Sequence, residues 1–181
     1  MRRIRFCAAL VTIAGAALAG PSMAAAQCTA SGAPATCNLP GSVSMTAGRV
    51  VRVQVSAGST TLTAPTPADF DAGFNSTTGP ALTVSANAAW TLHVRASAAL
   101  WTATNTSPGA PARTTKPAAD LKWSTASNGT FNALTTTDVV LVGGSATASN
   151  ATTLYFRTLY NWTLDTPGNY SLAVILTLTS P

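Results

Sequence analysis

Two segments of the chain alternate apolar and polar residues with a period of two. In segment 49–55 (RVVRVQV), every second residue from position 51 is valine, and Arg52 and Gln54 lie between the valines. Segment 90–95 (WTLHVR) repeats the pattern, with Trp, Leu and Val at the even positions. A strand places alternate side chains on opposite faces of a sheet. Both segments are therefore predicted to be half-buried strands.

Eight further short apolar segments are separated by clusters of Gly, Pro, Asn and Ser. Turn signals lie at 127–129 (SNG) and 166–169 (TPGN). Many short strands with regular turns predict an all-β fold, an antiparallel β-sandwich (immunoglobulin-like), with a jelly roll or an open barrel as the runner-up. The eight expected strands are 60–63, 82–86, 100–104, 121–124, 130–134, 139–142, 154–162 and 170–179.

Two segments rich in Pro, Gly, Thr and Ala, 65–80 and 105–117, are predicted to be exposed loops and candidates for binding. The last strand loses its alternation at 174–176, which predicts a central or swapped strand covered on both faces. The turn at 165–170 is predicted to join segment 154–164 to this last strand in a C-terminal hairpin.

The end of the chain, Asp-Thr-Pro-Gly-Asn-Tyr-Ser-Leu-Ala-Val-Ile-Leu-Thr-Leu-Thr at 165–179, places a Pro-Gly-x-Tyr turn before a final strand. It resembles the closing hairpin of secreted bacterial immunoglobulin-like and fimbrial or spore-coat-type surface proteins. The resemblance covers this segment only. It implies the architecture of a surface β-sandwich more than a particular function.

The N-terminus has the pattern of a secretory signal peptide. A basic head (MRRIR) precedes an apolar stretch at 6–19, and three alanines at 24–26 stand before Gln27. A membrane-spanning helix needs about 20 apolar residues, whereas Gly20 and Pro21 interrupt this stretch. We therefore expect a signal peptide at 1–26, a single β-sandwich domain at 27–181, and a secreted or cell-surface protein with no stable membrane span after cleavage.

Cysteine usage agrees with an oxidising compartment. Cys7 lies in the expected signal peptide, which leaves Cys28 and Cys37. Such a pair predicts one disulfide that closes a short N-terminal loop. A metal site would need more ligands than this pair and His93, the only histidine, provide. We expect no metal and no cofactor.

Charge is sparse. The chain of 181 residues has ten Lys and Arg against five acidic residues, all of them Asp, and charged residues make up 8%. Three arginines leave with the signal peptide, so the net charge of the mature chain falls to +2. This balance excludes a typical nucleic-acid-binding protein. The remaining cations are scattered, so that only folding could assemble them into a polyanion-binding patch: Arg49, Arg52, Arg95, Arg113, Lys116, Lys122 and Arg157.

No set of residues predicts catalysis. His93 falls on the outward face of its predicted strand, and no Gly-x-Ser-x-Gly motif accompanies it. Asp69 and Asp71 lie close enough to suggest Ca²⁺, but no Asp-rich segment continues from them, and a solvated turn is the simpler interpretation. We expect no catalytic residue and no enzyme activity.

Tryptophans are the remaining candidates for binding. Trp101, Trp123 and Trp162 lie in or beside predicted strands, where burial is the default and exposure would provide a stacking surface. The function that we predict is that of an exported structural or adhesive surface protein. It would act by strand addition, to itself or to other surface proteins, through segment 43–55 or the C-terminal strand. The alternative is a module that binds carbohydrate or another ligand through exposed tryptophan.

Overall fold

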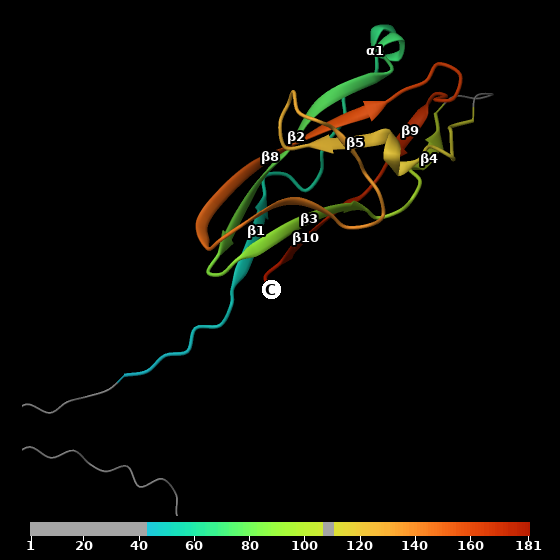
Figure 1. Cartoon of the computed structure of the whole chain (residues 1–181). Coiled ribbons are helices and arrows are strands. Elements are labelled where there is room, and N and C mark those ends of the chain that lie inside the picture. Colours follow the sequence, from blue (N-terminus) through green and yellow to red (C-terminus); the bar gives the residue numbers. More distant parts are fainter. Residues whose placement is uncertain (1–42, 107–110) are drawn as a thin grey trace, which may run out of the picture. The chain divides into compact units, whose positions relative to one another are not determined.

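The computed structural model describes residues 43–106 and 111–181 (Figure 1). The chain forms two units, Met1–Thr46 and Ala47–Pro181. Residues 43–46 are the described part of the first unit; they are exposed and belong to no strand. The expected signal peptide and the expected disulfide between Cys28 and Cys37 lie outside the described residues. The fold below is that of Ala47–Pro181.

The described residues form ten strands, one α-helix and one 3-10 turn. Five strands form one sheet in the order β1-β2-β8-β5-β6, three form a second in the order β10-β3-β7, and β4 pairs with β9. Neighbouring strands are antiparallel throughout. The elements are β1 (Val51–Val55), α1 (Pro67–Ala72), β2 (Phe74–Ala86), β3 (Trp90–Ala96), β4 (Thr102–Asn105), η1 (Ala118–Asp120), β5 (Leu121–Ser124), β6 (Asn132–Ala133), β7 (Val139–Gly144), β8 (Thr147–Leu159), β9 (Gly168–Ser171) and β10 (Val174–Thr179).

The core lies between the two larger sheets, as the alternation predicted. Every second residue of β3 from Trp90 is buried, and Leu92 has no exposed surface. Leu82 and Val84 of β2 are each 1% exposed and belong to the same cluster, as does Leu154 of β8. Burial of one face of each sheet against the other is the arrangement of a β-sandwich. The all-β sandwich is therefore confirmed, while its immunoglobulin-like type stays a prediction.

Segment 65–80 was expected to be a loop, and this prediction is wrong. It contains α1 and the first half of β2. Thr66 caps the helix: its hydroxyl accepts from the Asp69 N–H, and the Asp69 carboxylate accepts from the Thr66 N–H at 2.7 Å. Gly73 ends the helix with φ 78°. This capping box makes one short helix from a sequence whose composition indicates a loop.

β2 continues through Gly79 and Pro80, where its register with β8 shifts. Proline donates no hydrogen bond to a ladder, so a bulge at this point is the arrangement that the strand allows. A Cβ on Gly79 would lie 2.7 Å from the Phe156 ring. Glycine at 79 thus lets the Phe156 ring pack directly on the backbone of β2.

The expected C-terminal hairpin is also wrong. β8 pairs with β2 on one edge and, at 155–158, with β5 on the other, so the end of β8 that a hairpin would use is already paired. Expected strand 170–179 divides at 172–173 into β9, which pairs with β4, and β10, which pairs with β3. β10 is an edge strand of its sheet and not the central strand that we predicted. Expected strand 60–63 is absent, because segment 57–65 pairs with no strand in the described chain.

Candidate functional site

A cleft of about 1340 Å³ opens on one side of the sandwich. Segment 55–65 lines one wall of it, and the core residues Leu154 and Phe156 contribute to the lining. Leu172, Val174 and Leu176 line it from the chain around β9 and β10. This wall begins where β1 ends: Ser56, whose N–H donates to the Ala81 carbonyl of β2 at 2.9 Å, makes the last backbone contact with β2 before the chain turns away.

β10 borders this cleft with an unpaired edge. Its backbone pairs with β3, and no other strand of the described chain pairs with it. All of its residues from Val174 to Leu178 are only partly buried. The cleft therefore joins two features that another chain can use, partly exposed apolar side chains and unpaired backbone groups.

Aromatic side chains from two distant segments meet at the cleft. Trp162 stacks on Phe70 of α1, with ring centroids 4.6 Å apart and planes at 28°, and its indole N–H donates to Asp71 at 3.0 Å. Tyr160 packs against the same Phe70 ring at 5.4 Å. Burial raises the pKa of the Tyr160 hydroxyl above its ordinary value. These contacts attach α1 to the chain that follows β8.

A buried network of charges lies behind the aromatic side chains. Lys116 Nζ donates to Asp165 at 2.9 Å and to the Leu159 carbonyl at 2.8 Å, and Arg113 Nη1 donates to Asp165 at 3.0 Å. Arg113 and Lys116 also form ion pairs with Asp120 at 3.2 and 3.5 Å. The side chains of Lys116 and Asp165 are 3% and 6% exposed.

The network is balanced in charge. Burial by itself would raise the pKa of Asp165, but hydrogen bonds from Lys116 and Arg113 outweigh it and lower that pKa below its ordinary value. Two cations face two carboxylates, so each buried charge has a partner. Satisfied ion pairs of this kind hold segments in place. Here they attach segment 113–120 to the turn before β9.

The three tryptophans predicted as binding candidates have different environments. Trp101 is 6% exposed, and its indole N–H donates to the Pro117 carbonyl at 3.1 Å. Trp123 is 4% exposed, and its N–H has no partner among the described residues. Trp162 is 59% exposed. Of the three, only Trp162 presents most of its surface to solvent, although both Trp101 and Trp162 line the cleft.

The other candidates from the sequence, which were considered for catalysis and for metal binding, do not come together in a common site among the described residues. His93 lies in β3 opposite Thr177 and Val140. Among the described residues, no group of three or more His, Cys, Asp or Glu side chains lies close enough to hold a metal ion. The described part of the chain also has no helix of the length and hydrophobicity that crossing a membrane requires.

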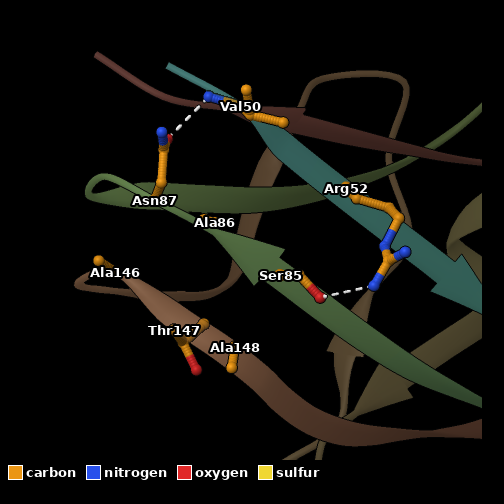
Figure 2. Close-up of a pocket in the computed structure, with 8 residues that line it drawn as sticks. All are labelled: Val50, Arg52, Ser85, Ala86, Asn87, Ala146, Thr147 and Ala148. Atoms are coloured by element: carbon orange, nitrogen blue, oxygen red, sulfur yellow. Dashed lines mark hydrogen bonds between the residues drawn. The ribbon is translucent and has the colours of Figure 1, made fainter. Parts of the chain in front are cut away.

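A second, more open hollow of about 600 Å³ lies where β1 begins (Figure 2). Asn87 accepts from the Val50 N–H and donates to the Gly48 carbonyl, both at 2.8 Å. Farther along the same strands, Arg52 donates to Ser85 at 3.2 Å (Figure 2). Asn87 thus fixes the chain from Gly48 onward against the turn that follows β2.

No protein-family model matches this chain, and no curated protein has a matching sequence. The geometry of the cleft therefore carries the functional argument.

Neither the cleft nor the charge network was predicted from the sequence. Lys116 and Asp165 are 49 positions apart, so the sequence contains no local signal of their contact.

Proposed function

We propose that this protein is an exported structural or adhesive subunit that associates with other copies of itself by strand addition. The observation that carries the proposal is the apolar cleft beside the unpaired edge of β10. An added strand would hydrogen-bond to that edge and bury alternate side chains in the cleft. Added strands gain affinity from main-chain hydrogen bonds and specificity from the pockets that receive their side chains.

The segment before β1 has the composition that such a strand needs. Val43, Met45 and Ala47 alternate with polar residues or glycine, so an extended conformation would place them on one face. Val43 and Met45 are 101% and 88% exposed. An extended apolar stripe of this kind is stabilised when a partner covers it.

The size of the cleft favours an extended chain over a small molecule. Pockets for small ligands hold about 300–1000 Å³, and this cleft measures about 1340 Å³. Its lining includes Leu62, Leu154 and Leu176. The cleft thus suits a row of apolar side chains.

The test is size-exclusion chromatography with light scattering on the exported protein over a wide range of concentration. We expect the mass to rise with concentration in the wild-type protein. The double variant Val43→Asp/Met45→Asp is expected to stay monomeric, because it places two charges on the apolar face of the added strand. Neither residue belongs to a strand in the described fold, so stability should be unaffected.

The matched control is Ser44→Asp/Thr46→Asp, which adds the same charge to the opposite face of the same segment. It should associate as the wild-type protein does. A wild-type protein that stays monomeric at every concentration would overturn the proposal. Equal loss of association in both double variants would show that charge, and not an apolar face, governs association.

Trp162 supports a second candidate function, the binding of a carbohydrate or another ligand. Its ring is mostly exposed and is held in place by Phe70 and Asp71, as in a stacking surface for sugars. Titration with a panel of glycans should then change tryptophan fluorescence in the wild-type protein but not in Trp162→Ala. No change across the panel would contradict this second function.

A further inference from the structure

The outer face of the five-stranded sheet, opposite to the cleft, brings two scattered cations together. Arg157 of β8 lies directly opposite Lys122 of β5 and, on its other side, directly opposite Ser76 of β2. In the sequence the two cations are far apart and in unrelated contexts. Directly opposite residues in an antiparallel pair have Cβ atoms about 4.5–5.5 Å apart.

Arg157 is held in one orientation. Its guanidinium carbon lies 4.3 Å from the centroid of the Phe74 ring and 4.1 Å from that of Phe131. Its Nε donates to the Ser76 hydroxyl at 3.3 Å. Aromatic rings attract the faces of a guanidinium, whereas its hydrogen-bond donors point outward in its plane. The two terminal nitrogens form no ion pair with any residue that the structure describes.

This pair of cations is electrostatically unfavourable in the protein alone. Like charges directly opposite each other destabilise a sheet, and neither Lys122 nor Arg157 forms an ion pair within the described chain. The ion pairs of the described residues instead involve Arg95, Arg113 and Lys116. Such a local conflict is typical of a binding site.

We propose that Lys122 and Arg157 form a subsite for the anionic groups of an acidic polysaccharide. A carboxylate placed between them would accept from the fixed fork of Arg157 and from the Lys122 ammonium, which relieves their repulsion. Tyr155, two residues along β8 from Arg157, falls on the same outer face by alternation and lies opposite Thr78 of β2. An aromatic ring and a hydroxyl suit a sugar, whereas a nucleic acid would need a larger excess of positive charge.

The test uses the exported protein and biolayer interferometry on immobilised polygalacturonate, with dextran as the neutral polymer. Lys122→Gln should weaken binding at least about tenfold, which corresponds to one charge-assisted hydrogen bond. Arg157→Lys keeps the charge but removes the planar fork, and it should also weaken binding. We expect no binding to dextran.

The matched control is Arg52→Gln, which removes the same charge from the same sheet. Arg52 lies opposite Ser85, nine residues along β2 from Ser76, or about 30 Å. Salt screens charges over about 10 Å. We therefore expect the affinity of Arg52→Gln for polygalacturonate to stay within about twofold of wild type.

Three outcomes would overturn the proposal. One is that the wild-type protein does not bind polygalacturonate. Another is that Lys122→Gln and Arg52→Gln weaken binding equally, which would show nonspecific attraction. The third is equal or tighter binding to duplex DNA or to anionic phospholipid vesicles, which would assign the pair to phosphate. The cleft lies on the other face of the sheet, so association tested through Val43 and Met45 is a separate outcome.

Discussion

Two neighbouring strands of the same sheet differ in how well the sandwich covers them. Val94 of β3 lies opposite Leu176 of β10, and both residues are apolar. Val94 is 1% exposed, whereas Leu176 is only partly buried and lines the cleft. The same side-chain chemistry thus occurs once in a closed core and once beside an open cleft. The comparison teaches that the sandwich is complete over β3 and incomplete over β10, where our proposal places a second copy.

The buried charge network provides the largest expected effect. Asp165→Ala would leave Lys116 and Arg113 without their shared carboxylate in a buried site. Removal of one partner of a buried ion pair costs about 3–5 kcal/mol in the free energy of unfolding, which urea unfolding measures. A loss well below this range would show that water replaces the carboxylate and that this end of the cleft is as open as the rest.

The pH dependence of stability gives an independent measure of the same network. The pKa of Asp165 is lower in the folded protein than its value of about 3.9 in an unfolded chain. The stabilisation that the Asp165 carboxylate provides is therefore complete above the pKa of the unfolded chain, about 4. It is lost as the pH falls from there through the lower pKa of the folded protein. Asp165→Asn should flatten the acid side of the stability profile, and an unchanged slope would exclude Asp165 as its source.

The comparison of β3 with β10 can be tested directly with matched truncations. Leu92→Ala removes a side chain with no exposed surface and should cost about 2–5 kcal/mol in urea unfolding. Leu176→Ala removes the same atoms from a partly exposed site, where the expected loss is about 1 kcal/mol, because less surface is withdrawn from water on folding. Equal losses would show that β10 is covered as completely as β3.

Two glycines differ in the space around them, and the one at the cleft gives the smallest expected effect of all. In Gly79→Ala, the added Cβ would lie 2.7 Å from the Phe156 ring and 2.9 Å from the Leu154 carbonyl oxygen, so the expected loss of stability is about 1–3 kcal/mol. Gly58 lines the cleft, and a Cβ there would meet no atom within 4 Å. Thermal unfolding of Gly58→Ala should match the wild type within about 0.5 kcal/mol, and a larger loss would show that the cleft wall is more tightly packed.

Local patterns predicted much of the fold. The alternation of β3 correctly predicted its buried face, β1 lies within the expected segment 49–55, and β5 matches the expected segment 121–124. Composition predicted a loop at 65–80, but turn-forming residues there make a helix cap and a bulged strand. The capping box from Thr66 to Asp69 was the available signal for that helix.

The sequence by itself determined that the chain is mostly strands and which side chains of β3 face inward, because alternation depends on neighbours one or two positions away. Only the tertiary structure decided that β10 joins β3 instead of β8, and that Lys122 lies beside Arg157. Pairing and register join residues distant in the chain, and the energy of these contacts depends on every other strand that competes for the same edge. The cleft and both proposed sites arise at that level.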